Sequence, residues 1–91
     1  MFHLVAYDIA SPKRLKKIAS LCLDYGVRIQ YSVFQFDLNE ELTACFLDRL
    51  QEIIDPAQDS VMVIPVCGTC RKKIHVFGQG KLYEEPLLFQ L

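Results

Sequence analysis

The sequence contains no long hydrophobic run, although 52% of its 91 residues are hydrophobic. Without a stretch of about 18 or more apolar residues, it predicts no membrane-spanning helix. Its first residues also lack the basic segment, apolar core and cleavage site of a secretion signal. We therefore expect one domain, located in the cytoplasm and without a membrane partner. The high apolar content of so short a chain indicates that a partner covers part of its surface.

An excess of charge is also missing. The formal net charge is −1, which argues against unspecific binding to nucleic acid. The charges are nevertheless segregated, because residues 1–36 and 60–81 are mainly basic whereas residues 37–59 are mainly acidic. One face of the domain could therefore hold phosphate groups while the other stays solvated.

The four cysteines lack the spacing of a complete metal site. Cys22 and Cys45 fall at apolar positions of helical stretches, so we expect buried core thiols. The Cys67–Cys70 motif supplies only half of a zinc site, and His3 and His75 are isolated in predicted strands. A redox pair would need its first cysteine at a helix start, which the surrounding residues do not indicate. We therefore expect structural thiols in a turn between strands.

Two helices are predicted from their caps and apolar stripes. Ser11-Pro12 is a typical helix start, and Gly26 is expected to end this helix in a left-handed conformation. Asn39 caps a second helix, which Asp55-Pro56 stops. The residues expected to face the core are Leu15, Ile18, Ala19, Cys22 and Tyr25 in the first helix, and Leu42, Cys45, Phe46, Leu50, Ile53 and Ile54 in the second.

Three further segments predict strands. Residues 2–8 are apolar on both faces, as in a central strand that is covered on both sides. Residues 61–64 end at Pro65, which places that end at a sheet edge or a bulge. Residues 74–77 are expected to pair back after a turn.

The segment 27–38 is ambiguous. Its apolar residues alternate along the chain, but the phase of the alternation changes at Val33-Phe34. A regular strand cannot change phase, because its apolar side chains would then turn outward. The segment is either one strand with a bulge or two short strands that meet in a tight turn around Tyr31-Ser32.

The order of these elements predicts an α+β fold. Strand, helix, strands, helix and strand form a ferredoxin-like βαββαβ sheet with two helices on one face. We expect this domain to span residues 1–80, followed by a tail at 81–91 that contains an extra strand. The other sheet face then needs a cover, and the apolar segment Leu87–Leu91 would be unfavourable if it were left in water.

Asp8 is the candidate site residue because it ends a buried strand, where ligands usually bind in open sheets. The following helix carries Lys13, Arg14, Lys16 and Lys17 at its amino end, which already bears partial positive charge. This cluster indicates a phosphate site, although a solvated acid beside a solvated basic face is the alternative. Mg²⁺ or another divalent cation needs only one or two carboxylates, and Asp8 of two protomers could share it across a twofold axis.

Several motifs together resemble the CRISPR-associated protein 2 family. They are Tyr7-Asp8-Ile9, the Lys13–Lys17 helix opening, residues 25–34 through Ser32-Val33-Phe34, and the segment from Asp59-Ser60-Val61 to Cys67. Gln35 departs from the family pattern, in which an acid follows Ser-Val-Phe, and this makes position 35 a poor metal ligand.

The resemblance implies a homodimeric subunit of CRISPR adaptation that binds DNA or RNA and the integrase subunit, CRISPR-associated protein 1. It also implies that a second protomer covers the open sheet face and that the tail, through Leu87–Leu91, pairs with this partner protomer. It also implies a metal-dependent endonuclease whose catalytic residue and metal ligand is Asp8. Lys13, Arg14, Lys16 and Arg28 are the predicted nucleic-acid contacts. Tyr7 and Phe34 are expected to support the site as core or interface aromatics rather than as platforms for bases.

The sequence leaves more than one function open. The first is a Mg²⁺-dependent endonuclease that cleaves RNA or double-stranded DNA. The second is a purely structural dimer that bridges the integrase during spacer acquisition, with Asp8 idle. A toxin-like ribonuclease of the same fold is a further alternative. An RNA-recognition module is disfavoured, because the aromatic signature expected on its central strands is missing.

Overall fold

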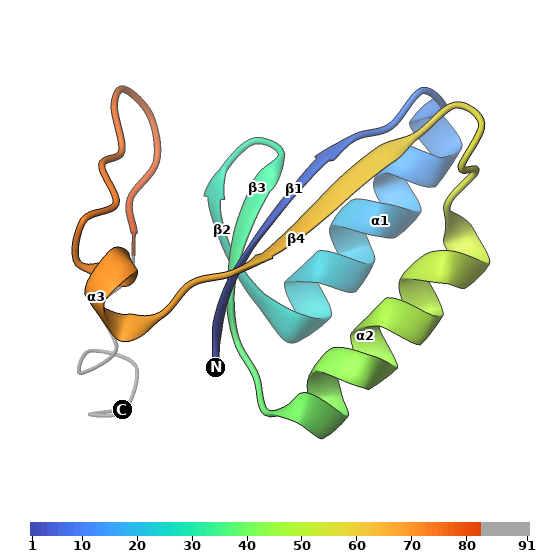
Figure 1. Ribbon diagram of the computed structural model, residues 1–91. Coiled ribbons are helices and arrows are strands. Elements are labelled where there is room, and N and C mark those ends of the chain that lie inside the picture. Colours follow the sequence, from blue (N-terminus) through green and yellow to red (C-terminus); the bar gives the residue numbers. More distant parts are fainter. Residues whose placement is uncertain (83–91) are drawn as a thin grey trace.

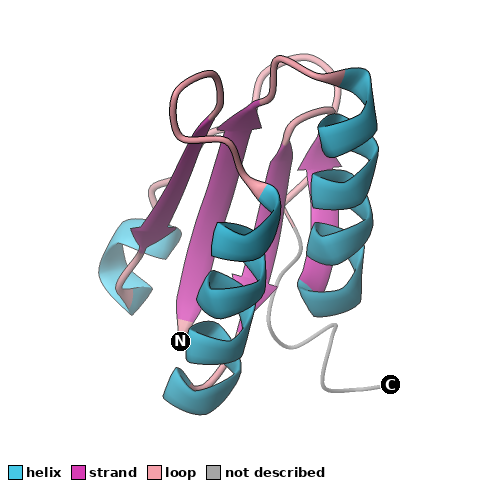
Figure 2. Ribbon diagram, turned by 90° about the vertical axis from the view of Figure 1, so that its right-hand side faces the viewer, coloured by secondary structure: helices cyan, strands magenta, loops and turns pink. Residues whose placement is uncertain are grey.

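The computed structural model describes residues 1–82. Its sheet consists of β1 (Phe2–Asp8), β2 (Gly26–Gln30), β3 (Val33–Asp37) and β4 (Ser60–Pro65) in the order β2-β3-β1-β4, with neighbouring strands antiparallel. Helices α1 (Pro12–Tyr25) and α2 (Glu40–Ile53) lie side by side on one face of this sheet (Figures 1 and 2). A single turn, α3 (Gly68–Arg71), follows β4. The predicted α+β, ferredoxin-like fold with a central β1 is confirmed. Within residues 1–82, no helix has the length and apolarity needed to cross a membrane.

The core lies between the sheet and the two helices. Val5 and Tyr7 of β1 contribute to it from the central strand. The rings of Phe36 and Phe46 meet edge to face with centroids 4.7 Å apart, an arrangement that the ring quadrupoles favour. The other buried members of this core are Ile18, Leu21, Cys22, Phe34, Leu38 and Leu50. Burial of each such side chain is worth about 1.5–3 kcal/mol, which makes this layer the main source of stability.

Both predicted helix caps are confirmed. The Ser11 hydroxyl accepts a hydrogen bond from the Arg14 backbone N–H at 3.3 Å, and the Asn39 side chain accepts one from Leu42 at 2.8 Å. These bonds satisfy donors that have no partner inside the helix.

The predicted inner face of α2 is partly wrong. Cys22 is buried as expected, but Cys45 is exposed and Leu42 is 45% exposed. The stripe that packs on the core runs through Phe46, Leu47, Leu50 and Ile53, so the 3.6-residue period turns Cys45 toward the side of the helix.

The ambiguous segment resolves into a hairpin that also contains an irregularity. β2 and β3 are joined by a turn at Tyr31-Ser32, and their register shifts between Arg28 and Gln30. The turn and the bulge therefore coexist, which explains why the apolar phase changes along this segment.

The reason for a glycine at position 26 differs from the prediction. Gly26 has φ −160° and ψ −161°, which is extended backbone and not a left-handed conformation. A β-carbon there would collide with the Phe36 ring and with the carbonyl oxygen of Gln35. Glycine is required because β3 approaches the backbone closely where α1 passes into β2.

The predicted strand at 74–77 is wrong, since these residues form no regular structure. Helix α3 turns the chain away after β4, and the following segment reaches the other edge of the sheet, where Gln30 donates a hydrogen bond to the Gln79 carbonyl at 3.3 Å (Figure 1). A strand cannot pair with β4 from there. The predicted pairing of the tail through Leu87–Leu91 lies outside the described residues.

The substitution Gly26→Ala should destabilise the protein by about 1–3 kcal/mol, the usual cost of overpacking. The clash involves the Gln35 backbone, so side-chain rotation alone cannot relieve it. Urea unfolding would measure the loss. The control is Gly68→Ala, because no atom lies within 4 Å of a β-carbon at that position. Equal stabilities for the two variants would contradict the assigned role of Gly26.

Candidate nucleic-acid and metal site

Asp8 lies at the end of the central strand, between two neighbouring segments. It pairs with Ser60 on β4, while the Tyr7 N–H donates a hydrogen bond to the Ser32 carbonyl of the hairpin turn at 3.1 Å. Tyr7 points into the core, so the alternation of side chains places Asp8 on the opposite face, which α1 and α2 do not cover and which is called the helix-free face below. Asp8 is exposed there and is accessible to a ligand.

Arg28 lies on the helix-covered side of the sheet. Its register partner is Phe34, and its guanidinium carbon lies 5.2 Å from the centre of the Phe34 ring. A pocket of about 290 Å³ opens beside it, between α1 and the hairpin, and Tyr7, Lys16 and Tyr31 also line it. This pocket combines two cations with aromatic rings.

Tyr7 and Phe34 are both buried, with their rings stacked at a centroid distance of 6.1 Å. They pack as core aromatics. Burial raises the pKa of the Tyr7 phenol, and a hydrogen bond with Arg28 opposes this rise. Tyr7 is therefore a neutral partner of Arg28 at ordinary pH.

The predicted site residues thus fall into separate groups. Asp8 faces the helix-free side, whereas Lys16 and Arg28 line the pocket on the other side of the sheet. Lys13 is exposed at the amino end of α1. A nucleic acid that reached both Asp8 and Arg28 of one chain would have to pass around the sheet edge.

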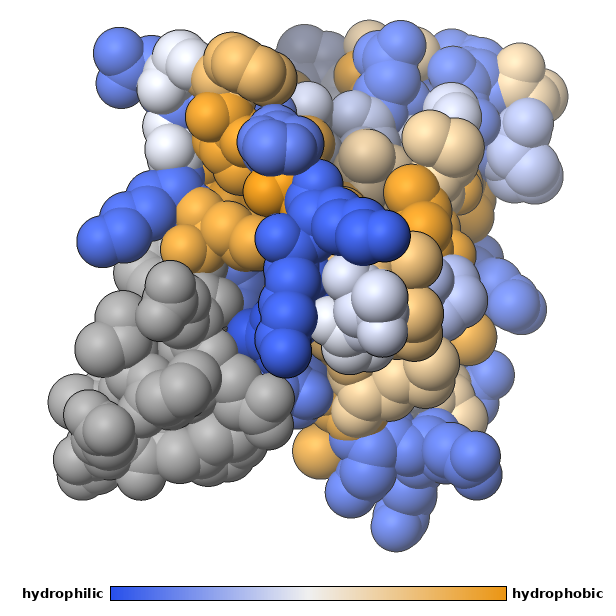
Figure 3. Space-filling model, turned by 60° about the vertical axis from the view of Figure 1, so that its left-hand side comes forward, coloured by the Kyte–Doolittle hydropathy of each residue, from blue (hydrophilic) through white to orange (hydrophobic). Residues whose placement is uncertain are grey.

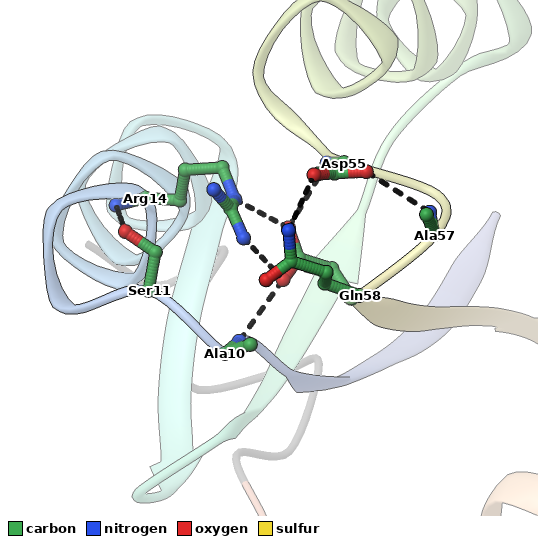
Figure 4. A network of polar contacts seen from close by, with 7 residues as sticks. Ala10, Ser11, Arg14, Asp55, Ala57 and Gln58 are labelled. Atoms are coloured by element: carbon green, nitrogen blue, oxygen red, sulfur yellow. Dashed lines mark hydrogen bonds and ion pairs between the residues drawn. The ribbon is translucent and has the colours of Figure 1, made fainter.

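Arg14 is held by an ion pair. Its Nε and Nη2 atoms donate hydrogen bonds to the two carboxylate oxygens of Asp59 at 2.7 and 3.1 Å. The Asp59 side chain is fully buried and also accepts hydrogen bonds from the backbone N–H groups of Ala10 and Asp55, both at 2.9 Å. Figure 4 shows how these groups converge. Arg14 therefore has a structural role.

This cluster positions the surroundings of Asp8. Ala10 belongs to the β1–α1 connection, whereas Asp55 and Asp59 belong to the α2–β4 connection, so Asp59 joins the two loops next to the Asp8–Ser60 pair. The Arg14 guanidinium, supported by the two backbone donors, lowers the pKa of Asp59 well below its usual range. In the sequence, Asp59-Ser60 was recognisable only as part of a family motif, and the role of Asp59 in joining the two connections was not predicted.

One chain does not complete a metal site. Among residues 1–82, no three His, Cys, Asp or Glu side chains are grouped so that they could hold an ion. Gln35 shares the face of Asp8 but pairs with Leu4, which lies four residues before Asp8 on β1. At the usual rise of a strand, this separates Gln35 from Asp8 by about 13 Å. A cation at Asp8 would therefore need a further ligand from another molecule.

The helix-free face also carries exposed apolar side chains on edge strand β4. Met62 pairs with Ala6 and is 57% exposed, and Ile64 pairs with Leu4 and is 41% exposed. Figure 3, which brings this side of the molecule forward, shows hydrophobic patches between hydrophilic residues. Such a surface is suited to contact with another protein.

The fold and the site define a ferredoxin-like domain with an exposed acid at the end of its central strand. Residues 1–74 match the family described as CRISPR associated protein Cas2. A Synechocystis relative, named a CRISPR-associated endoribonuclease Cas2, is 33% identical over 92% of this chain and 91% of its own length. A Thermus thermophilus relative, named a CRISPR-associated endonuclease Cas2, is 38% identical over 90% of this chain and 87% of its own.

Solved structures agree with these relatives. The crystal structure of Streptococcus pyogenes Cas2 has a TM-score of 0.77 and 34% identity, and the match covers 86% of this chain and all of that one. A hypothetical protein from Thermus thermophilus gives a TM-score of 0.80 at 37% identity, over 91% of this chain and 96% of its own. The chain belongs to the Cas2 family of CRISPR-associated proteins, as its motifs indicated.

The ion pair predicts the response of stability to pH. The pKa of Asp59 is lowered in the folded state. Its contribution to the free energy of unfolding is therefore complete above the unfolded-state pKa of about 4, and it declines as the pH falls toward the folded-state pKa. Asp59→Asn should therefore lower the urea midpoint at pH 7, and the difference in midpoint between the wild type and the variant should become smaller at acidic pH. Asp48→Asn, at an exposed position of α2, is the control. A difference in urea midpoint that stays constant from pH 7 to pH 3 would contradict the stabilising role of ionised Asp59.

Proposed function

We propose that this protein is a metal-dependent endonuclease subunit of CRISPR adaptation that acts as a homodimer on DNA or RNA. The observation that carries the proposal is the position of Asp8, exposed at the end of the central strand on the face away from α1 and α2. The nuclease names of its relatives support the reaction class. Bridging of the CRISPR integrase subunit is the larger assembly role that the family resemblance suggests.

The helix-free face supports the homodimer. A twofold axis through this face would bury the exposed apolar side chains of β4, Met62 and Ile64, against their copies or against Leu4 and Ala6. The same axis would bring two Asp8 residues toward each other. Dimerisation would thus supply the ligand that a single chain lacks.

The two Asp8 carboxylates would hold a divalent cation, of which Mg²⁺ is the most suited to carboxylate, water and phosphate oxygens. When bound, such an ion polarises the phosphodiester and lowers the pKa of a coordinated water. Asp8 itself would contribute the negative charge that attracts the cation, and its carboxylate would orient that cation. In the absence of an ion, two facing carboxylates would repel each other, so the pair favours a bound cation.

The cations of α1 would bind the nucleic-acid backbone. Lys13, Lys16 and Lys17 are exposed in the first turns of α1, where the helix end adds partial positive charge. Arg28 would provide a second contact at the pocket between α1 and the hairpin. Arg14 would contribute mainly through its pair with Asp59, which leaves less of its guanidinium available. These side chains would contact phosphate groups, so the binding would show no preference for particular bases.

A structural scaffold is the second candidate. One observation favours it: among the described residues, Asp8 belongs to no group of three or more His, Cys, Asp or Glu side chains that could hold a metal ion. A dimer of this kind could bridge the integrase and hold DNA through its cations while Asp8 stays idle. The two functions are compatible, since a scaffold can retain a nuclease site.

The variant Asp8→Asn separates these functions. It retains the shape of the side chain but removes the charge that would hold Mg²⁺, so cleavage of RNA or duplex DNA should fall at least 100-fold, to the level seen with EDTA. Gel assays with Mg²⁺ and EDTA arms measure this. Spacer integration with the integrase should remain, and sedimentation should still give a dimer.

The matched control is Asp48→Asn, which removes the same charge from α2. If Asp8→Asn cleaves as fast as the wild type, Asp8 is not catalytic and the activity comes from a contaminant. If neither the wild type nor the variant cleaves while both support integration, the scaffold alone is correct.

Replacement of Lys13 and Lys16 by Gln should weaken nucleic-acid binding equally for all sequences. Loss of two phosphate contacts should also reduce the slope of log K against log salt by about 1.8 on duplex DNA. Binding titrations at several salt concentrations test this. Gln at Lys72 and Lys73 removes the same charge just after α3. An unchanged slope for the α1 variant would show that these lysines are only solvated.

A further inference from the structure

Cys67 and Cys70 are not placed as the sequence suggested. The motif was expected in a turn between two strands, but Cys67 caps the helical turn α3 and Cys70 lies within it. The Arg71 N–H donates a hydrogen bond to the Cys67 carbonyl at 2.8 Å, which closes the turn. Residues three apart in such a turn lie on the same side, so the two side chains are neighbours.

The short helical turn keeps the two thiols close together, and each influences the pKa of the other. Both are exposed, so a reagent in solution can reach them. Within residues 1–82 they belong to no group of three or more metal-ligating side chains. The local arrangement therefore favours chemistry between the two sulfurs over metal binding.

We propose that Cys67 and Cys70 form a reversible dithiol–disulfide pair, in which Cys67 attacks and Cys70 resolves. The co-reactant is a small-molecule disulfide. The Cys67 thiolate attacks one of its sulfurs, the S–S bond breaks, and one thiolate leaves. Cys70 then loses its proton and attacks the Cys67 sulfur, which releases the second thiolate. Two electrons pass from the protein to the small molecule, and the products are one protein disulfide and two small thiols.

The electrostatics of the pair support this order. The backbone N–H groups of Cys70 and Thr69, together with the Cys70 thiol, lower the pKa of Cys67. The same thiol contact raises the pKa of Cys70. Cys67 is therefore the thiol of the pair that ionises more readily, and thiolates are the nucleophiles of disulfide exchange.

The remaining cysteines differ in ways that make them internal controls. Cys22 is buried, and this burial raises its pKa to about 12, so it should stay reduced in the folded protein. Cys45 is exposed on α2 and lies outside the α3 turn. It reports the reactivity of an ordinary accessible thiol.

The anchoring of α3 shows that the pair lies in an ordered part of the chain. Arg71 follows Cys70 directly, and its guanidinium carbon lies 4.2 Å from the centre of the Phe2 ring. The same side chain forms an ion pair with Asp37 at 3.7 Å. The Val66 N–H donates a hydrogen bond to the Phe2 carbonyl at 2.9 Å on the other side of the motif. Both flanks are therefore tied to β1 and β3.

The test uses the full chain equilibrated with graded ratios of reduced to oxidised glutathione. Free thiols are then trapped with an alkylating reagent under denaturing conditions and counted by mass spectrometry. We expect two alkylation sites to be lost together, at Cys67 and Cys70, in the wild type and in Cys45→Ser alike. Independent loss of the two sites, or no loss at any ratio, would overturn the proposal.

Single variants test the order of attack. Cys70→Ser should accumulate a mixed disulfide with glutathione at Cys67, because the resolving thiol is missing. Cys67→Ser should accumulate several-fold less at Cys70. Equal modification of both variants would reject the assigned roles. Zinc that co-purifies with the wild type and is lost from either variant would assign the pair to metal binding instead.

A measurement on the wild type needs no substitution. In the folded protein, Cys67 should be alkylated several-fold faster than Cys45 at pH 7, and this ratio should fall as the pH rises, because the advantage of the lowered Cys67 pKa is then lost. A ratio near one at pH 7 would show that Cys67 is an ordinary surface thiol.

Discussion

The alternation of side chains along β1 is the constraint on which the rest of the structure depends. β1 pairs with β3 on one side and with β4 on the other, so its register decides which residues of all three strands enter the core. Val5 and Tyr7 point toward the helices, and Asp8 must therefore point the other way. A shift by one residue would bury this carboxylate without a partner and expose the core. The accessibility of Asp8 is thus a consequence of core packing.

The loops around Asp8 depend on a second interaction, the ion pair between Arg14 and Asp59. Asp59 accepts four hydrogen bonds, from the Arg14 side chain and from the Ala10 and Asp55 backbones. Its desolvation is therefore compensated, as a buried charge requires. The sequence analysis assigned Arg14 to phosphate binding on charge alone. The structure gives it a positioning role that composition could not reveal, because the partner is 45 residues away.

Helix α3 changes the course of the chain after β4. A hairpin after Pro65 would have placed a fifth strand beside β4, but the turn at Cys67 leads the chain to the β2 edge instead. The helix-free face of β4 consequently keeps Met62 and Ile64 exposed. The same turn places two thiols on the same side of the chain, whereas a strand, with its alternating side chains, would have directed them to different sides.

Features that rest on local chemistry could be predicted from the sequence. Ser11 and Asn39 cap helices because their side chains reach nearby backbone donors, and the apolar residues on both faces of β1 predict its central place. The family followed from motifs whose order and spacing are preserved along the chain. Three features became known from the tertiary structure alone. Gly26 is needed for the close approach to β3, Arg14 forms an ion pair with Asp59, and Asp8 and Arg28 lie on opposite faces of the sheet. Each of these depends on contacts between residues far apart in the chain, and a single sequence carries no direct signal of such contacts.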